Sequence, residues 1–338
     1  MIVHDKMLRM SLAITPTPEH YYAHSADAAT ALCKAAGDSL RMQILKVLQQ
    51  NAYGVLELCA VFGIQQPAMS HHLKILASAS LVATRREGTS IFYRRHELTA
   101  EDPLFDLQNS LFQTIDSINL DQNYTDKLSS INANRCAASV AFFNQNVNRF
   151  EENQDLIASW SDYGESVIGF IPKQMSNKHS ALEVGAGYGQ FLVALALEFN
   201  QVTALDNSKE MLEQCVTRVS AQKIKNVEFC FGNTQKIIEF GNKFDFISLN
   251  MVLHHNPSPA DIIQDCAQLL HSQGMLMITE LCAHDQEWTK QSCGDLWLGF
   301  EPAFLSRWTA SAGLIEGNSL YLTQRNGFRI QLRQFHKN

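Results

Sequence analysis

The sequence predicts two folded parts, an N-terminal helical unit that ends in a β-hairpin and a C-terminal α/β unit built on a parallel sheet. Three observations support this prediction. The chain has 338 residues, more than one hydrophobic core usually organises. Apolar residues recur at helical spacing up to residue 79 and then change to the period of a strand. From residue 181 onward, short apolar runs alternate with helical segments, as in a doubly wound sheet.

The composition is that of a globular protein, with 46% hydrophobic and 18% charged residues. No apolar run is long enough to span a bilayer, and residues 1–18 lack the basic start and the apolar core of a signal peptide. We therefore expect a cytoplasmic protein with no membrane partner. The eight cysteines occur singly, without a CxxC pair, so we expect buried free thiols rather than a zinc finger or a disulfide framework.

The net charge of −7 conceals one basic stretch. Its charged residues are Lys74, Arg85, Arg86, Glu87, Arg94 and Arg95. Because acidic residues dominate elsewhere, this stretch is the candidate contact with nucleic acid.

The N-terminal unit is expected over residues 26–100, after a tail of residues 1–25. Its expected elements are two helices within residues 26–50, separated near Gly37 and Asp38, a helix over 55–62 that ends at Gly63, a helix over 67–79, and a hairpin over 81–93 with its tip at 87–90. Two helices joined by a tight turn and followed by a basic hairpin are typical of a winged helix-turn-helix. In that fold the second helix of the motif enters the major groove of DNA.

The second helix of this motif carries the candidate DNA-binding residues Gln66, Ser70, His71 and Lys74, opposite an apolar stripe of Met69, Leu73 and Leu76. Glutamine and serine can pair with base edges, the histidine can reach a base or a phosphate, and the lysine can neutralise a phosphate. Arg85 and Arg86 lie near the hairpin tip, where they can follow the DNA backbone or enter the minor groove. Any one of them could be an ordinary solvated residue, but with the fold signals they favour DNA binding.

Residues 26 to 96 resemble the ArsR family of bacterial repressors. The similarity rests on residues 36–45, Glu57-Leu58-Cys59, Ser70-His71-His72-Leu73-Lys74 and Arg85-Arg86-Glu87-Gly88. It implies a homodimer that binds a palindromic operator in double-stranded DNA. Many members of that family are released from DNA by metal ions, through a box that needs a second cysteine two residues after the first. Here Val61 occupies that place after Cys59, so we expect no metal ion.

Residues 101–178 are expected to form helices that connect the two units and mediate dimerisation. One apolar stripe supports this interpretation, made of Leu104, Leu107, Leu111, Ile115 and Ile118. The stripe alone could equally pack against its own domain.

Residues 179–338 are expected to form a Rossmann-like domain. The apolar runs and helical segments are residues 181–184, 191–199, 202–205, 211–219, 227–231, 244–250, 262–270 and 275–281. The tail departs from this alternation, because Asn326-Gly327 stands between two strand-like runs and predicts an antiparallel hairpin within residues 320–334.

A glycine-rich turn follows the first strand of this domain. Glu183 precedes Gly185, Gly187 and Gly189, and Asp206 ends the next strand about twenty residues later. Glycines let the backbone approach a ligand closely, and a carboxylate at that strand end can accept both ribose hydroxyls. A dehydrogenase fingerprint has similar glycine spacing, but it lacks an acidic residue before the first glycine.

Residues 180 to 335 resemble class I S-adenosylmethionine-dependent methyltransferases. The motifs that carry the similarity are Asp206–Leu212, Gly232–Thr234 and Leu249–His255. The resemblance implies that S-adenosylmethionine or S-adenosylhomocysteine binds with its ribose at Asp206, its adenine near Asn233 and Thr234, and its methionine part near Asn250. Asn207 is also expected to bind this ligand. The family commonly has an aspartate at the position of Asn233, although an amide can still contact the adenine amino group.

Two functions remain open for this domain. The fused architecture resembles bacterial repressors of the methionine cycle that respond to S-adenosylhomocysteine, which implies a ligand sensor. The alternative is an active methyltransferase of a small molecule with an autoregulatory DNA-binding domain. A methyltransferase that uses the winged helix to reach nucleic acid is a third, less favoured interpretation, because sequence-specific repressors and base-modifying enzymes dock differently.

An enzyme would need a general base, for which His254, His255 and His284 are candidates. Histidines at strand ends are also common as hydrogen-bonded neighbours of a ligand, so no catalytic residue is assigned. Trp288, Trp297 and Phe300 could line a substrate cavity or fill a core, and we expect the core.

Overall fold

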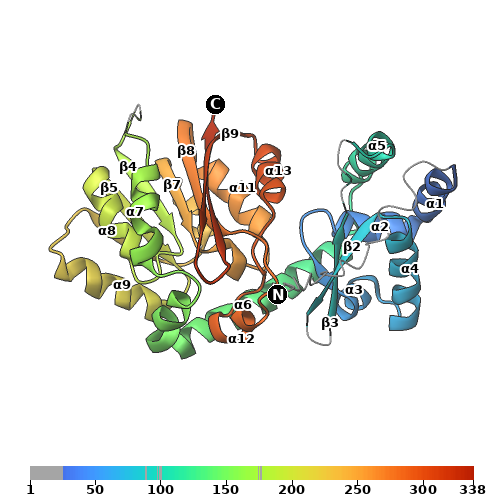
Figure 1. Ribbon diagram of the computed structural model, residues 1–338, viewed down its shortest axis with the longest axis horizontal. Coiled ribbons are helices and arrows are strands. Elements are labelled where there is room, and N and C mark those ends of the chain that lie inside the picture. The colour runs from blue at the N-terminus through green and yellow to red at the C-terminus, as the bar shows by residue number, and fades with distance from the viewer. Residues whose placement is uncertain (1–25, 88–89, 97, 99–100, 174, 176) are drawn as a thin grey trace, which may run out of the picture. The chain divides into compact units, whose positions relative to one another are not determined.

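The computed structural model describes residues 26–338 except 88–89, 97, 99–100, 174 and 176 (Figure 1). The chain divides into two compact units, Met1–Thr125 and Asp126–Asn338. Residues 101–178, expected as a connector, are therefore shared between the two units. None of the described helices combines the length and the apolar character that crossing a membrane requires.

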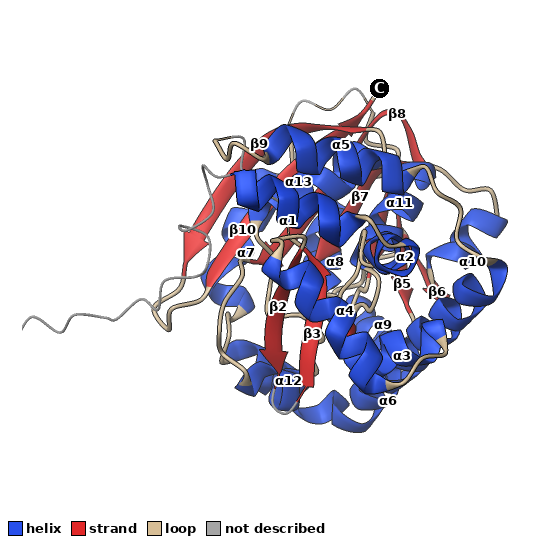
Figure 2. Ribbon diagram, turned by 90° about the vertical axis from the view of Figure 1, so that its right-hand side faces the viewer, coloured by secondary structure: helices blue, strands red, loops and turns tan. Residues whose placement is uncertain are grey.

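The N-terminal unit is helical with one small sheet. Its elements are α1 (Ala26–Ala36), α2 (Ser39–Val47), β1 (Tyr53–Gly54), α3 (Val55–Phe62), α4 (Gln66–Ser78), β2 (Val82–Glu87), β3 (Ser90–Arg95), α5 (Phe105–Asp116) and the first residues of α6 (Gln122–Asp155). Strands β2 and β3 lie side by side (Figure 2). Strand β3 pairs with β1 on its other side and is antiparallel to both. The predicted helix-turn-helix and hairpin are confirmed, although the residues 88–89 of the predicted tip lie outside the described residues.

Local chemistry explains where these helices begin and end. Asp38 caps α2, because its carboxylate accepts the backbone N–H of Arg41 at 2.9 Å. Gly63 ends α3 in the left-handed conformation, with φ of +68°, which favours glycine. Pro67 stands in the first turn of α4, where its missing N–H costs no helical hydrogen bond. The predicted breaks at residues 37–38 and 63 are therefore confirmed.

Helix α5 shows what the apolar stripe of residues 104–118 does. Phe112 and Ile115 are buried, whereas Leu107 is 40% exposed. The helix packs on α2, where Lys46 Nζ donates a hydrogen bond to the carbonyl oxygen of Asp116 at 2.8 Å. Within the stripe, Ile115 is buried, Leu107 is exposed, and Leu104, Leu111 and Ile118 are half-buried, so its own unit covers the stripe only in part.

The C-terminal unit contains one seven-stranded sheet with helices on both faces. Its elements after α6 are α7 (Trp160–Phe170), β4 (Ser180–Val184), α8 (Gln190–Glu198), β5 (Gln201–Asp206), α9 (Lys209–Ala221), β6 (Val227–Phe231), α10 (Thr234–Glu239), β7 (Phe244–Asn250), the short 3-10 helix η2 (Leu253–His255), α11 (Pro259–Leu269), β8 (Leu270–Leu281), α12 (Trp288–Cys293), α13 (Pro302–Ser311), β9 (Leu314–Thr323) and β10 (Arg329–Lys337).

The strand order is β6-β5-β4-β7-β8-β10-β9. The first five strands in this order are parallel, while β10 is antiparallel to both of its neighbours. The predicted terminal hairpin is confirmed, and Gly327 in its turn has a φ of +92°. Helices α7 and α8 pack together on one face, whereas α11 packs with α10 and α13 on the other (Figure 1).

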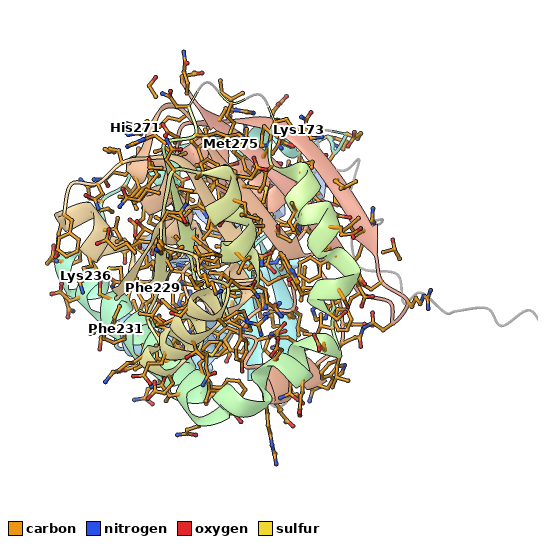
Figure 3. All side chains as sticks on the ribbon, turned by 90° about the vertical axis from the view of Figure 1, so that its left-hand side faces the viewer. Lys173, Phe229, Phe231, Lys236, His271 and Met275 are labelled. Carbon is orange, nitrogen blue, oxygen red and sulfur yellow. The ribbon has the colours of Figure 1, made fainter. Side chains whose placement is uncertain are left out.

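The carboxyl ends of the parallel strands lie at one edge of the sheet. Figure 3 shows Phe231, the last residue of β6, beside Lys236, with Met275 and His271 at the opposite end. Lys236 Nζ donates to the carbonyl oxygen of Phe231 at 2.7 Å. Ligands of open α/β sheets bind at the edge formed by the carboxyl ends.

The sequence pattern missed α10, α12 and α13, and it extended the helix α11 one residue too far. Leu270, the last residue of the predicted segment 262–270, has extended dihedral angles and opens β8. The run from His271 to Gly274 is polar, so the apolar pattern gave no sign of a strand before Met275.

Candidate functional site

A cavity of about 440 Å³ lies at the carboxyl ends of β4, β5 and β7. Glu183, Asp206 and Asn250 line it from the ends of these three strands. The structure therefore brings together three acidic or amide residues that are far apart in the sequence.

The glycine-rich turn forms one wall of this cavity. Gly185 and Gly187 have φ angles of +70° and +52°. A Cβ atom on Gly185 would lie 2.3 Å from Cγ2 of Val252, so the turn has no room for a side chain there. Gly189, with φ of +73°, is the N-cap of α8, and a Cβ atom there would lie 2.7 Å from Cys215 Sγ. Gly189 is not among the residues that line the cavity.

Asp206 is held by the backbone of the two turns beside it. Its Oδ2 accepts the N–H of Gly187 at 3.0 Å, and its Oδ1 accepts the N–H of Ser208 at 2.8 Å. Burial raises the pKa of Asp206, and these hydrogen bonds oppose the rise. A carboxylate offers about four acceptor sites, so the fixed group can still accept ligand hydroxyls.

Glu183 is fully buried next to Asp206 in the same wall. Its Oε2 has no hydrogen-bond partner among the described residues. Burial, together with the charge of Asp206, raises the pKa of Glu183 well above its ordinary value. In the ligand-free protein, ionised Glu183 beside Asp206 would therefore lower the stability of the folded state.

Replacing Glu183 with glutamine should stabilise the ligand-free protein at high pH. The folded wild type binds more protons than the unfolded chain between the ordinary pKa of Glu183 and its raised value, so stability falls as the pH rises through this window. At pH 8 the variant should gain about 1 kcal/mol, or about 2–4 °C in Tm, and at pH 4 the gain should vanish. Thermal unfolding at several pH values measures this. Glu198→Gln, on an exposed carboxylate paired with Lys178, is the control. An equal gain at both pH values would contradict the assignment.

The remaining predicted ligand-binding residues lie around the same cavity. Asn207, Asn233 and Thr234 all line it. Asn233 also caps α10, because its Oδ1 accepts the N–H of Lys236 at 3.3 Å, and the Thr234 hydroxyl donates to Asp265 at 2.5 Å. Asn233 therefore has a structural role whatever it binds.

Helices α6 and α7 complete the cavity wall, which the sequence analysis did not anticipate. The lining residues that they contribute are Cys136, Ser139, Phe143, Glu151, Gln154, Asp155, Trp160 and Tyr163. The polar pattern of α6 carries no ligand motif, so no sequence signal could have placed these residues here. On α11, Asp261 and Asp265 stand four residues apart and also line the cavity.

Helix α6 is fastened to the ligand-binding turns. Ser208, the N-cap of α9, donates its hydroxyl to Asn144 Oδ1 at 2.7 Å. Gln190, the first residue of α8, donates to Glu151 Oε1 at 2.7 Å. The Tyr188 hydroxyl of the glycine-rich turn donates to the carbonyl oxygen of Val147. These contacts join α6 to the glycine-rich turn and to the starts of α8 and α9.

The charged residues of the cavity wall are almost all acidic. The acidic residues are Glu151, Asp155, Glu183, Asp206, Asp261 and Asp265. His255 is the histidine that lines the cavity. Lysine and arginine do not occur among the described residues that line it. The wall is therefore suited to a ligand that carries positive charge.

The three histidines considered as general bases lie in different surroundings. His255 lines the cavity, and burial beside His254 lowers its pKa well below the ordinary value. His254 is fully buried; burial lowers its pKa, but Glu280 and Asp295 raise it to about 9. His284 packs its ring against Phe328 and is not among the lining residues. Of the three, His255 alone borders the cavity.

The aromatic residues of the 288–300 segment also lie away from the cavity wall. Trp297 and Phe300 are buried, and Trp288 is half-buried against Phe328. They belong to the packing of the unit, in line with the expected core role.

In the N-terminal unit, α4 presents one polar face. Gln66, Ser70, His71 and Lys74 are all exposed. Its opposite face is apolar and buried, with Met69, Leu73 and Leu76 at 0% exposure. The four predicted residues therefore lie on one exposed surface and do not pack in the hydrophobic core.

The arginines of the hairpin do not form one basic surface. Arg86 is exposed and Arg85 is half-buried, whereas Arg95 is only 5% exposed. Arg95 Nε donates to the carbonyl oxygen of Leu45 at 2.7 Å, and its guanidinium pairs with Asp116 at 2.6 Å. Arg95 thus holds α2 and α5 to the sheet, and the charge count overstated the basic surface.

The cysteines are all free thiols, but they differ in burial. Cys215, Cys266 and Cys293 are buried, Cys33 is exposed, and the other four are half-buried. The expectation of buried thiols is therefore wrong for Cys33. Cys59 is half-buried on α3, with Val61 fully buried behind it.

Two families match the chain, one in each unit. The family described as bacterial regulatory protein, arsR family, matches residues 38–84. A helix-turn-helix-type transcriptional regulator of Methanocaldococcus jannaschii is 43% identical over 68 residues, which are 19% of this chain and 74% of that relative. The chain belongs to the ArsR family. The methyltransferase domain family matches residues 175–308, which lie in the C-terminal unit. This unit is therefore a class I methyltransferase domain.

Other relatives of the ArsR-family chain are partial. The helix-turn-helix-type transcriptional regulator KmtR of Mycobacterium tuberculosis is 46% identical over 57 residues, 17% of this chain and 44% of KmtR. The methyltransferase YcgJ of Bacillus subtilis is 23% identical over 103 residues, 30% of this chain and 41% of YcgJ. The chain thus spans less than half the length of these two relatives.

Solved structures similar to this ArsR-family chain include YcgJ of Bacillus subtilis. It has a TM-score of 0.45 and 14% identity, over 52% of this chain and 99% of that chain. The N-methyltransferase NodS of Bradyrhizobium japonicum in complex with S-adenosyl-L-homocysteine has a TM-score of 0.43 and 16% identity, over 56% of this chain and 98% of that chain.

Proposed function

We propose that this ArsR-type transcriptional regulator is a homodimeric repressor whose affinity for a palindromic operator depends on S-adenosylhomocysteine or S-adenosylmethionine in its methyltransferase domain. By the resemblance to repressors of the methionine cycle, genes of that cycle are the expected targets. Ligand binding regulates DNA binding only when the ligand has different affinities for the DNA-competent and the released states.

The observation that carries this proposal is helix α6. Its first residues, from Gln122, belong to the N-terminal unit, and its last turns line the cavity. The helix is continuous between these two ends, and the hydrogen bonds to Ser208 and Gln190 link it to the ligand-binding turns. A ligand that moves those turns therefore acts on the residues that lead into the DNA-binding unit.

The same cavity supports both ligands through the ribose and adenine contacts proposed for Asp206, Asn233 and Thr234. S-adenosylmethionine differs by a methyl group and the positive charge of its sulfonium. The acidic wall attracts that charge, so its affinity should fall more steeply with salt than that of S-adenosylhomocysteine.

Calorimetry of the full chain with each ligand, at about 50 and 500 mM salt, tests ligand binding. Fluorescence anisotropy then tests regulation, with an operator selected from random-sequence DNA and measured at fixed salt with and without each ligand. We expect at least a fivefold change in operator affinity, corresponding to about 1 kcal/mol of coupling. Equal operator affinity in the absence and presence of both ligands would overturn the sensor function.

Variants of α4 and the hairpin should separate affinity from sequence preference. Arg86→Ala should weaken binding to all DNA sequences and lower the salt slope by about 1, because a phosphate contact carries no sequence information. Ser70→Ala and His71→Ala should instead alter the selected sequence, at a cost of about 1–3 kcal/mol on the wild-type operator. Repeating the selection with each variant measures both effects. A changed sequence preference in Arg86→Ala would contradict this division of roles.

The second candidate function is methyl transfer to a small acceptor. The position of His255 in the cavity wall favours it, since an imidazole that borders the cavity is within reach of an acceptor. Burial lowers the pKa of His255, which keeps the ring neutral but makes it a weaker base. Incubating S-adenosylmethionine with the full chain and small-molecule extracts, and measuring S-adenosylhomocysteine release, tests it. Release that His255→Gln abolishes would support catalysis, and S-adenosylmethionine that stays intact would exclude it for those acceptors.

A further inference from the structure

A buried cluster of two histidines and two carboxylates lies beside the cavity. His254 and His255 form the short helix η2 after β7, Glu280 stands near the end of β8, and Asp295 follows α12. Asp295 Oδ1 lies 3.8 Å from His254 Nε2 and 3.6 Å from His255 Nδ1. His255 Nδ1 also lies 3.4 Å from the carbonyl oxygen of Gly294, a contact that an ion bound to this nitrogen would replace. The side chains of His254, Glu280 and Asp295 have 0% exposure, so water does not solvate these charges.

Glu280 fixes the orientation of His254. Its Oε1 lies 2.5 Å from His254 Nδ1, and its Oε2 accepts the backbone N–H of His254 at 3.2 Å. The same carboxylate accepts the backbone N–H of Leu281 at 2.6 Å. The proton of a neutral His254 is therefore held on Nδ1, and Nε2 is turned toward Asp295.

No protonation state satisfies the atoms on the far side of that ring. His254 Nε2 and both carboxylate oxygens of Asp295 are buried without a close hydrogen-bond partner among the described residues. Besides His254, the groups that stabilise the charged Asp295 carboxylate are the Thr289 hydroxyl and the Lys290 ammonium. If Nε2 carries a proton, its nearest carboxylate oxygen at 3.8 Å is too distant to accept it. If Nε2 carries none, a lone pair faces a carboxylate without a donor between them. In both cases these buried polar atoms stay unsatisfied, and a cation bound between them would satisfy them.

We propose that His254 Nε2, His255 Nδ1 and an Asp295 oxygen bind one zinc ion. One donor atom from each of the three residues lies within 4.8 Å of the others. Bond lengths of about 2.0–2.2 Å in a tetrahedral site separate donors by about 3.3–3.5 Å, so the two distances from Asp295, 3.8 and 3.6 Å, need to close by a few tenths of an ångström. One nitrogen of each imidazole lies within 4.8 Å of the other, and this pair has to close further. Two imidazoles and one carboxylate form a donor set that zinc commonly takes.

Charge and second-shell geometry agree with this assignment. A zinc ion that displaces the Nε2 proton of His254 would replace one positive charge by two beside the buried carboxylates of Glu280 and Asp295. The pairing of Glu280 with His254 Nδ1 is the arrangement in which a carboxylate orients a zinc-bound histidine. The ion has an entry path, because His255 also lines the cavity. The fourth position is available to a water molecule from that side.

The proposed site is separate from the DNA-binding unit and its incomplete box at Cys59. It joins η2 to the segment after α12, where the backbone N–H groups of Leu296 and Trp297 already donate to the carbonyl oxygen of His254. The Ser139 hydroxyl of α6 donates to the carbonyl oxygen of His255 at 3.1 Å. The ion would therefore stiffen the part of the cavity wall against which α6 rests.

Elemental analysis of the full chain, purified from zinc-supplemented cells and dialysed against metal-free buffer, tests the proposal. We expect about one zinc per chain in the wild type and less than about 0.2 in Asp295→Asn, since one of three ligands is lost. His284→Gln removes a histidine outside the cluster and should keep the ion. Circular dichroism verifies that each variant is folded. Wild-type chain without zinc, or Asp295→Asn with as much zinc as the wild type, would overturn the site.

Cobalt substitution gives a second readout that does not depend on how well Asp295→Asn folds. Adding Co²⁺ to the zinc-free wild type should produce the intense visible absorption of four-coordinate cobalt. Asp295→Cys should retain the ion and add a thiolate charge-transfer band near the ultraviolet, because a thiolate is also a good ligand. Glu280→Gln should keep all three ligands but bind about 10–100-fold more weakly. A spectrum that Asp295→Cys leaves unchanged would show that the ion binds elsewhere.

Discussion

Replacing Asp206 with alanine is expected to weaken the binding of S-adenosylmethionine and S-adenosylhomocysteine by roughly 100-fold or more, while operator affinity without ligand stays unchanged. The carboxylate is proposed to accept both ribose hydroxyls, and hydrogen bonds to a charged group are worth about 1.5–3 kcal/mol each. Gly187 and Ser208 hold the carboxylate in place before any ligand arrives, so the ligand gains these bonds without ordering the side chain. Calorimetry with both ligands measures the effect.

Asp245→Asn is the matched control for that variant. Asp245 is as buried as Asp206, at 8% exposure, and also accepts two backbone N–H groups, from His179 and Ser180. It lies at the opposite end of the sheet, outside the cavity lining. Asp245→Asn should cost stability but not ligand affinity. A folded Asp206→Ala chain that binds ligand like the wild type would refute the ribose assignment, and one that also loses ligand-free DNA binding would mark Asp206 as structural.

Replacing Arg95 with leucine is expected to destabilise the N-terminal unit by about 3 kcal/mol or more and to abolish operator binding at 37 °C. The substitution removes the donor to the Leu45 carbonyl and leaves Asp116 without its buried partner. It also removes the guanidinium that lies 4.6 Å from the centre of the Phe112 ring.

The distribution of tryptophan lets one experiment separate the two units. All four tryptophans, at positions 160, 288, 297 and 308, belong to the C-terminal unit. In urea, Arg95→Leu should shift the helical circular dichroism and the loss of DNA binding to lower denaturant, while the tryptophan fluorescence transition stays in place. Arg86→Leu, the same substitution at an exposed hairpin position, should change stability by less than about 0.5 kcal/mol. A common shift of both signals would mean that the units unfold together.

The zinc proposal and the sensor proposal fail in different ways. Loss of zinc in Asp295→Asn with unchanged ligand-dependent DNA binding would leave the sensor function intact. Loss of ligand response in Asp206→Ala with zinc retained would leave the metal site intact. The two proposals rest on neighbouring groups in the same unit, but on different atoms.

The sequence by itself determined the two units, the order of most strands and helices, and most of the ligand-binding turn. These features depend on local chemistry. A glycine such as Gly63 can adopt a positive φ, and an aspartate such as Asp38 can cap a helix, without help from distant residues. The ligand-binding turn is recognised from the spacing of Gly185 and Asp206 in the sequence. The Asn326-Gly327 turn specified its hairpin for the same reason.

Only the tertiary structure decided which distant groups share a surface or a cavity. A polar helix such as α6 has no pattern that reveals its contacts with Ser208 and Gln190, because those contacts depend on packing rather than on spacing. Arg95 counts as basic in the sequence, yet folding buries its charge against Asp116. His254 and Asp295 are forty-one residues apart, and their unpaired atoms face each other because β7 and the segment after α12 meet at one edge of the sheet.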